Sequence, residues 1–207
     1  MARFAGNNPR GFRVYFVRKS FRRVFRQGAL KLHSDRDIPR FEAAVLVHLD
    51  AAYNLARWLL RSEHDAQDVV QEACLRAFRS FDTLRGGAHA RCWLLAIVRN
   101  ACCSWLDRNH RNAPEPLSED ELDQIASQDD DPHDQLTRQA DADHVRAAID
   151  ALPPAFREAI VLRDLEGLSY KEISGITGVP IGTVMSRLAR GRKRLEERLS
   201  PALLKEA

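Results

Sequence analysis

The chain has 207 residues, of which 44% are hydrophobic and 7% aromatic, a composition typical of one large or two small globular domains and not of a fibrous protein. No stretch approaches the roughly 18 uninterrupted apolar residues of a membrane span, because polar residues such as His48 and Asp50 break the longest candidates. The net charge of +3 conceals blocks of opposite sign: +9 in residues 1–40, 0 in 41–106, −9 in 107–145, −1 in 146–179 and +4 in 180–207. This asymmetry predicts partners of differing charge.

Residues 1–40 combine glycines and prolines with a cluster of arginines, which predicts a flexible or weakly helical basic arm. Two interpretations stay open, contact with nucleic acid and a solvated extension without a specific task. The arm lacks the apolar core of a secretory signal, so we expect a cytoplasmic protein with reduced thiols. The cysteines Cys74, Cys92, Cys102 and Cys103 fit neither a disulfide framework nor a zinc site. They lie in helical patterns and are expected to be small core residues, with Cys103 on an outer face.

Residues 41–111 are predicted to form a helical domain. Between Asp65 and Phe81 one helix face is apolar without a gap: Ala66, Val69, Val70, Ala73, Cys74, Ala77, Phe78 and Phe81. The opposite face carries Asp68, Gln71, Glu72, Leu75 and Arg79. Leu75 is an apolar residue framed by acids and amides, which is typical of an anchor for a partner, although a single exposed leucine often has no role.

A second amphipathic helix is predicted from about Ala90 to Asp107. Its inward residues are expected to be Leu94, Ile97, Val98, Ala101 and Trp105, and its outer residues Arg99, Asn100, Cys103 and Asp107. Most of this outer face is compatible with simple solvation. Residues 112–141 follow as an acidic linker, because prolines, dense acids and few large apolar residues leave too little surface to bury.

Residues 142–207 are predicted to form a second helical domain, with one helix to Ala151 and another from Ala155 to about Leu165. Ser169 and Glu172 form a capping box, Gly178 supplies a left-handed turn residue, and Pro180 opens the last helix. The residues of this last helix that are expected to be buried are Ile181, Val184, Leu188, Leu195 and Leu199. A short helix, a turn containing glycine and a longer basic helix are the signature of a helix-turn-helix. The fold class is therefore all-α, with two small domains.

The last helix presents a polar and basic face: Thr183, Ser186, Arg187, Arg190, Arg192, Lys193 and Arg194. The N-terminal half of such a helix can read base edges in a major groove, and the later cations can neutralise phosphates. The alternative is a basic surface helix kept soluble by its charges. The sequence shows no catalytic triad, P-loop, dinucleotide fingerprint or paired histidines, so no enzyme activity, metal or cofactor is expected.

Three motifs occur in order: D-x-x-Q-E at 68–72, W-L-x-x-I-x-R-N at 93–100 and G-T-V-x-S-R-L at 182–188. With their flanking sequences they resemble the two domains of the extracytoplasmic-function (ECF) group of sigma-70 family sigma factors. The resemblance covers residues 41–111 (sigma region 2) and 142–200 (sigma region 4). The basic arm is not part of the family pattern.

The resemblance implies roles for individual residues. Asp68, Gln71, Glu72 and Leu75 would dock on the clamp helices of the largest subunit of RNA polymerase. The loop Thr83 to Arg91 and the helix after it would melt the minus-ten element and capture a flipped base, which implies roles for Arg91, Trp93, Arg99 and Asn100. The minus-thirty-five element would be read through Thr183, Ser186, Arg187 and Arg190, with Arg192 and Lys193 nearby. Met185 stands where many members carry a basic residue.

The resemblance therefore implies a factor that binds core RNA polymerase, directs it to specific promoters and promotes DNA melting. It also implies that an anti-sigma factor could hold both domains, as in many relatives. Two other hypotheses remain at this point. One is a stand-alone helix-turn-helix regulator, which would bind duplex DNA without polymerase. The other is a thiol-dependent enzyme using Cys102 and Cys103, which lacks any sign of a catalytic base.

Overall fold

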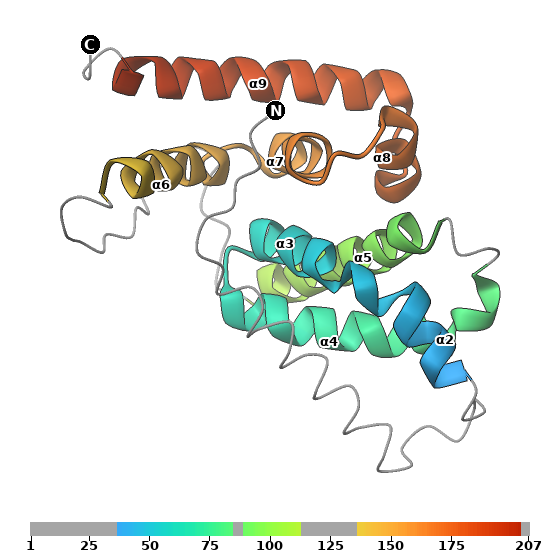
Figure 1. Cartoon of the computed structure of the whole chain (residues 1–207). Coiled ribbons are helices and arrows are strands. Elements are labelled where there is room, and N and C mark those ends of the chain that lie inside the picture. Colours follow the sequence, from blue (N-terminus) through green and yellow to red (C-terminus); the bar gives the residue numbers. More distant parts are fainter. Residues whose placement is uncertain (1–36, 85–88, 113–135, 204–207) are drawn as a thin grey trace. The chain divides into compact units, whose positions relative to one another are not determined.

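The computed structural model describes residues 37–84, 89–112 and 136–203, and the regular structure in these ranges is helical throughout (Figure 1). The chain divides into two compact units, the first built mainly from α2 to α5 and the second mainly from α6 to α9. The prediction of an all-α chain with two domains is confirmed. The basic arm up to residue 36 and most of the expected linker, residues 113–135, lie outside the described residues.

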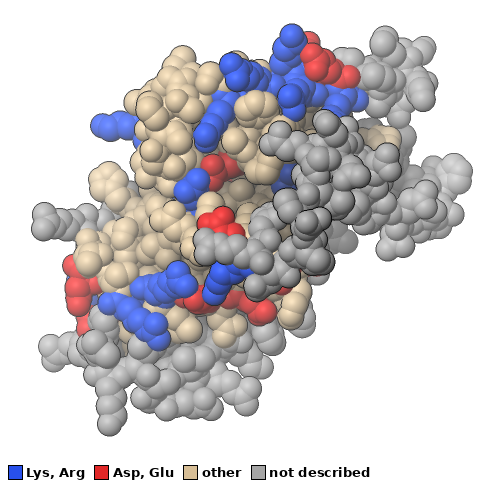
Figure 2. Space-filling view, turned by 180° about the vertical axis from the view of Figure 1, so that it is seen from behind, with Lys and Arg blue, Asp and Glu red and all other residues tan. Residues whose placement is uncertain are grey.

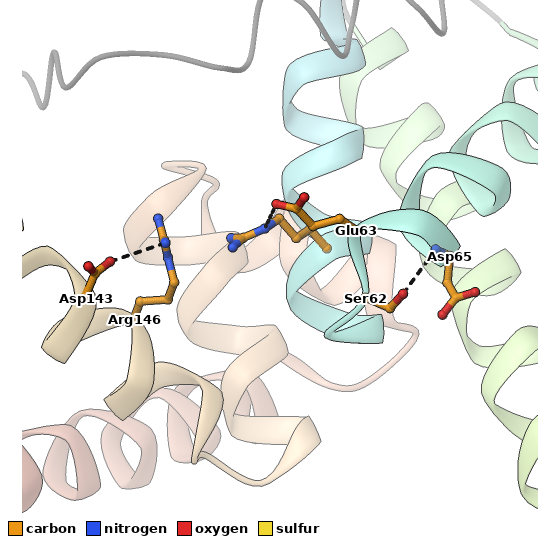
Figure 3. A network of polar contacts seen from close by, with 6 residues as sticks. Ser62, Glu63, Asp65, Asp143 and Arg146 are labelled. Carbon is orange, nitrogen blue, oxygen red and sulfur yellow. Dashed lines mark hydrogen bonds and ion pairs between the residues drawn. The ribbon is translucent and has the colours of Figure 1, made fainter. Parts of the chain in front are cut away.

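The first unit consists of α2 (Asp37–Ala44), a 3₁₀ turn (Leu46–His48), α3 (Leu49–Leu60), α4 (Glu63–Arg79), a second 3₁₀ turn (Phe81–Thr83) and α5 (Ala90–Asn112). A tight junction joins α3 to α4. Arg61 ends α3 in the left-handed region at φ 55°, and the Ser62 hydroxyl caps α4 by accepting a hydrogen bond from the backbone N–H of Asp65 at 3.3 Å (Figure 3). The side chains of Arg57 and Glu63 bridge the junction at 3.4 Å. This junction lets α3 and α4 pack against each other.

The core of the first unit is built around Phe41, which is completely buried. Its ring makes edge-to-face contacts with Phe78 and Phe81, each with ring centroids 5.2 Å apart. The whole apolar face predicted for residues 66–81 is buried, so that prediction is confirmed. Burial raises the pKa of the Cys74 thiol to about 12, which makes Cys74 a core residue and not a reactive thiol.

The buried side of α5 differs from the expected one by a rotation about the helix axis. Leu94, Val98 and Ala101 are buried as predicted, but Leu95 and Cys102 are buried with them, whereas Ile97 and Trp105 are only half-buried. Leu95 and Cys102 are seven residues apart and share a face, so they extend the stripe on the edge away from Ile97, whereas Trp105 lies on the stripe itself, eleven residues after Leu94. Cys103, expected on the outer face, is half-buried.

The second unit consists of α6 (Leu136–Asp150), α7 (Pro154–Ile160), a π-helical turn (Val161–Leu165), α8 (Tyr170–Thr177) and α9 (Ile181–Leu203). Helix α6 begins earlier than the expected Ala142, so the end of the expected linker is helical. An exposed ion pair at 3.4 Å joins Asp143 and Arg146 on this helix (Figure 3). Helices α6 and α7 both pack against α9.

The π-helical turn continues α7 to the point where the chain reverses. The N–H of Glu166 bonds to the carbonyl of Val161, five residues back, at 2.9 Å. The N–H of Leu168 then bonds to the carbonyl of Leu162 at 3.0 Å, with Gly167 at φ 71°. The left-handed residue that ends the turn is thus a glycine, and Leu162 and Leu168 on either side of it are both buried.

The helix-turn-helix forms as the capping box at Ser169 and the turn residue Gly178 predict. The backbone N–H of Ser169 donates to the Glu172 carboxylate at 2.8 Å, and the backbone N–H of Glu172 donates to the Ser169 hydroxyl at 3.3 Å. Gly178 adopts φ 72° between α8 and α9. The Ser174 hydroxyl donates to the carbonyl of Val179 at 2.7 Å, which ties the turn to α8.

The buried stripe of α9 is shorter than expected. Val184 and Leu188 are buried and Leu195 and Leu199 half-buried, but Ile181 is 44% exposed, so its assignment to the stripe was wrong. The α7 side chains that cover α9 reach Gly191, further along the helix, and leave its first turn open. At Gly191 a β-carbon would lie 3.0 Å from Cγ1 of Ile160, so the Ile160 side chain packs directly against the backbone of α9 there.

Candidate functional site

The four residues predicted to dock on polymerase lie together on α4. Asp68 and Glu72 are exposed, while Gln71 and Leu75 are half-buried. At about 100° per residue the four occupy one continuous arc of the helix. We call these four residues the α4 surface. Leu75, like Gln71, is thus partly covered, whereas the two acids are exposed.

Both acids of the α4 surface have basic neighbours on the same helix. His64 Nε2 lies 3.6 Å from a carboxylate oxygen of Asp68, and the guanidinium of Arg76 pairs with the carboxylate of Glu72. These pairs are four residues apart and exposed to solvent, so each contributes at most about 1 kcal/mol. A basic partner can therefore replace them at little cost.

The predicted minus-ten residues do not all share one side of α5. Trp93 and Asn100 are seven residues apart and lie on the same face, and Asn100 is exposed. A guanidinium nitrogen of Arg99 lies 3.5 Å from Oδ1 of Asn100, at the outer limit of a hydrogen bond. The Ser104 hydroxyl donates to the Asn100 carbonyl at 2.9 Å. Trp93, Arg99 and Asn100 thus form one polar and aromatic surface, which we call the α5 surface.

Arg91 lies on the opposite side of α5 from Asn100 and is half-buried. Its charge acts on His48, whose pKa is lowered first by burial and then by the nearby Arg91 guanidinium. Residues 85–88, in the loop expected to capture a base, lie outside the described residues. The assignment of Arg91 to the minus-ten site stays a prediction, separate from the α5 surface.

The basic face of α9 is open to solvent. Basic side chains gather along the upper edge of the molecule in Figure 2, over α9. Ser186 and Arg190 are exposed, and Thr183 and Arg187 are half-buried on the same helix. The Ser186 hydroxyl donates to the carbonyl of Thr183 at 3.0 Å, so its oxygen is left to accept a hydrogen bond from a base or from water.

Two of the α9 cations are bound within their own domain. Arg192 donates to both carboxylate oxygens of Asp164, at 3.2 Å from Nε and 2.6 Å from the terminal nitrogen, and this hydrogen bonding raises the pKa of Arg192. The guanidinium of Arg194 lies over the ring of Phe156, 5.3 Å from its centroid. Lys193 is 3.9 Å from Glu197, and its side chain is 77% exposed. Arg190 and Lys193 are therefore the more available phosphate partners.

Sequence reasoning missed Asp164 and its neighbour Tyr170, whose ring lies beneath the guanidinium of Arg163 at 5.0 Å. No short sequence motif predicts this cluster, because Asp164 and Arg192 are 28 residues apart and meet only in the folded domain. The π-helical turn places Asp164 where Arg192 can reach it.

Within the described ranges, no group of three or more His, Cys, Asp or Glu side chains is arranged to hold a metal ion. None of the described helices combines the length and the apolar character needed to cross a membrane.

Comparison with known proteins identifies both units. The model of "Sigma-70 region 2" matches residues 45–112, and that of "Sigma-70, region 4" matches residues 143–195. The ECF sigma-E factor of Haemophilus influenzae is 34% identical over 155 residues, which cover 69% of this chain and 78% of that relative. The chain belongs to the ECF sigma factors.

Other relatives agree. The sigma-H factor of Pseudomonas aeruginosa is 32% identical over 81% of this sigma factor and 89% of its own length. The ECF sigma factor SigE of Mycolicibacterium smegmatis is 39% identical over 79% of this chain, and the match spans 63% of that longer relative.

Two solved structures share the fold. The sigma factor RpoE, in complex with the anti-sigma factor NepR from Bartonella quintana, has a TM-score of 0.62 and 28% identity, over 78% of this chain and 97% of its own. CnrH, in complex with the cytosolic domain of CnrY, has a TM-score of 0.55 and 22% identity, over 81% of this chain and 90% of its own.

ECF sigma factors are transcription initiation factors that bind core RNA polymerase and promoter DNA, and they are not enzymes. The presence of a region 2 module beside the region 4 module also does not favour the stand-alone regulator, which would need only the helix-turn-helix.

Proposed function

We propose that this sigma factor binds core RNA polymerase in the cytoplasm, directs it to a subset of promoters and promotes opening of the DNA. The observation that carries the proposal is the combination, in one chain, of a region 2 module and a capped helix-turn-helix whose long helix is basic. The chemistry of initiation would remain with the polymerase.

The α4 surface is the proposed docking site for polymerase. A half-buried Leu75 surrounded by Asp68, Gln71 and Glu72 has the anatomy of an interface anchor, an apolar centre with a polar rim. The acids would attract a basic partner and set its orientation, while desolvation of Leu75 would supply affinity.

The α5 surface is the proposed site for the minus-ten element. Extruding a base from the stack costs a few kcal/mol, and an aromatic ring, an amide and a guanidinium can recover it by stacking and hydrogen bonding. Asn100 offers both a donor and an acceptor to a base edge, with Arg99 beside it and Trp93 on the same face. Arg91 would contribute charge at the periphery.

The first half of α9 is the proposed reader of the minus-thirty-five element. Thr183, Ser186, Arg187 and Arg190 offer hydroxyl and guanidinium donors to base edges and phosphates. Lys193 would neutralise a phosphate further along the helix. Arg192 is already neutralised by Asp164, so we expect it to contribute less to DNA affinity than Arg190.

The test is reconstitution with core polymerase on a promoter selected in vitro. The double variant Leu75→Ala with Glu72→Ala should weaken core binding by about tenfold or more, the range of an interface anchor, because the apolar centre and one rim charge are lost. Asp50→Ala is the matched control, since it removes an exposed acid from α3 of the same unit.

Two results would count against the proposal. Equal losses in the double variant and in Asp50→Ala would show that net charge, and not the α4 surface, governs docking. Tight stoichiometric binding to core polymerase without an open complex on any selected promoter would remove the initiation function itself.

An anti-sigma factor is a proposed partner. The support is the 28% identical sigma factor of Bartonella quintana, whose structure contains one.

A further inference from the structure

Two large apolar side chains stand exposed at the start of α9. Ile181 is 44% exposed and Met185 52% exposed, and they lie four residues apart, so they are neighbours on one edge of the helix. Gly182, between them in sequence, is also exposed and has open space where a β-carbon would be. We call Ile181 and Met185 the apolar edge of α9.

The apolar edge is not explained by the domain core. The stripe of α9 that packs against α7 runs through Val184, Leu188 and Gly191, and Gly191 meets Ile160 there. Exposing two large apolar side chains without a partner is unfavourable by the usual measure of about 25 cal/mol per Å². The edge therefore points to a binding partner.

Its surroundings indicate which partner. At about 100° per residue, Met185 lies between the buried stripe of α9 and the arc that carries Lys193, Ser186 and Arg190, so the apolar edge borders one side of the polar and basic face. A major groove, with phosphates along both rims and base edges between them, complements this arrangement. An apolar protein surface would instead have to bury the neighbouring guanidinium groups.

The major groove contains one apolar group, the C5-methyl of thymine. Helical side chains lean toward the N-terminus of their helix, so Ile181 and Met185 are directed to the end of α9 that enters the groove. Methionine also suits the task, because its unbranched and polarisable side chain adapts to the position of a methyl group.

We propose that Ile181 and Met185 read thymine methyl groups in the upstream promoter element, beside the base contacts of Ser186. The inference rests on the proposed function, since it requires α9 to lie in the groove. A basic residue at position 185 would favour guanine or phosphate, whereas Met185 shifts the preference at that step toward T·A pairs.

The experiment replaces thymine by deoxyuridine, one position at a time and on either strand, in the upstream element of a promoter selected with the full chain and core polymerase. This exchange removes only the methyl group. For the wild-type chain we expect about fourfold weaker promoter binding at one or two positions, the effect of one buried methyl group, and little change elsewhere.

In Ile181→Ala with Met185→Ala, the same exchanges should change binding by less than twofold, because the methyl group no longer has a partner. Val145→Ala is the control, since it truncates another exposed apolar residue of the second unit (43% exposed) and should keep the full deoxyuridine effect.

Several results would overturn the inference. Selected upstream elements without thymine on either strand would do so, as would wild-type binding that ignores deoxyuridine at every position. A deoxyuridine effect that persists in the double variant would assign the methyl contact to another residue. Loss of core binding in the double variant, with an unchanged deoxyuridine effect, would assign the apolar edge to a protein partner.

Any result that overturns the thymine-methyl inference would still be compatible with the proposed function, because the wild-type chain would still bind and open the promoter. Failure of the wild-type chain to open any promoter would instead defeat the proposed function.

Discussion

Replacing Gly191 by alanine should loosen the packing of α9 on α7. The added methyl group would lie 3.0 Å from Cγ1 and 3.4 Å from Cδ1 of Ile160, and 3.5 Å from Cβ of Phe156. Ile160 is only 1% exposed, so it cannot withdraw into solvent and would have to displace other core residues. Overpacking of this kind costs about 1–3 kcal/mol.

A matched control separates this cost from helix propensity. Gly175 is a helical glycine of α8 with nothing within 4 Å of its potential β-carbon, so Gly175→Ala should gain up to about 1 kcal/mol. Both variants share this propensity gain. We therefore expect Gly191→Ala to be less stable than Gly175→Ala by about 1–3 kcal/mol.

Native-state hydrogen exchange on the full chain can measure this difference. All three tryptophans precede residue 106, so peptides from α7 and α9 report the second unit more directly than fluorescence. Their slowest amides should exchange about 5–150 times faster in Gly191→Ala than in Gly175→Ala. Equal protection in the two variants would mean that Ile160 yields to the methyl group, and the packing argument would then be wrong.

Three further outcomes follow from local contacts. Ser169→Ala should destabilise α8 by about 0.5–2 kcal/mol, seen as faster exchange of its amides, because the hydroxyl that accepts a hydrogen bond from the Glu172 N–H is lost; unchanged protection would contradict this. Since the pKa of His48 is lowered in the folded state, the unfolded state binds more protons there and stability falls as the pH drops through the ordinary histidine range. The urea midpoint of His48→Gln should accordingly fall less between about pH 7.5 and about pH 5 than that of the wild type, and parallel curves would rule out His48 as the cause. Arg190→Ala should reduce the slope of log DNA affinity against log salt concentration by about 0.9. Arg192→Ala should reduce this slope less, because Asp164 already pairs with the Arg192 guanidinium. Equal reductions would show that Arg192 leaves Asp164 for a phosphate.

The features predicted correctly from sequence are those determined by neighbours along the chain. The apolar face of α4 follows from its 3.6-residue period, and the capping box at Ser169 and the left-handed Gly178 follow from residue chemistry at fixed offsets. The docking and DNA-contact residues came from motif resemblance, which assigns roles without describing the contacts each side chain makes.

The features that were missed depend on contacts between distant segments. Periodicity alone places Ile181 near the buried stripe, but only the folded domain shows that α7 covers later turns of α9 and leaves Ile181 exposed. The rotation of α5 arises in the same way, because Ile97 and Leu95 are equally apolar and only packing decides which is buried. The pairing of Arg192 with Asp164 required the π-helical turn, for which we know no sequence signal.

The number of residues in the π-helical turn Val161–Leu165 also determines how the helices of the second unit are oriented. Each residue of an α-helix turns the chain by about 100°, so the number of residues between α7 and Gly167 sets the direction in which the chain leaves. A one-residue deletion in this turn would leave the composition of α8 and α9 and their caps unchanged. It would nevertheless alter the angular phase between α7 and the helix-turn-helix and separate Asp164 from Arg192. Changes in chain length at this turn can thus redirect α9 without any substitution in that helix.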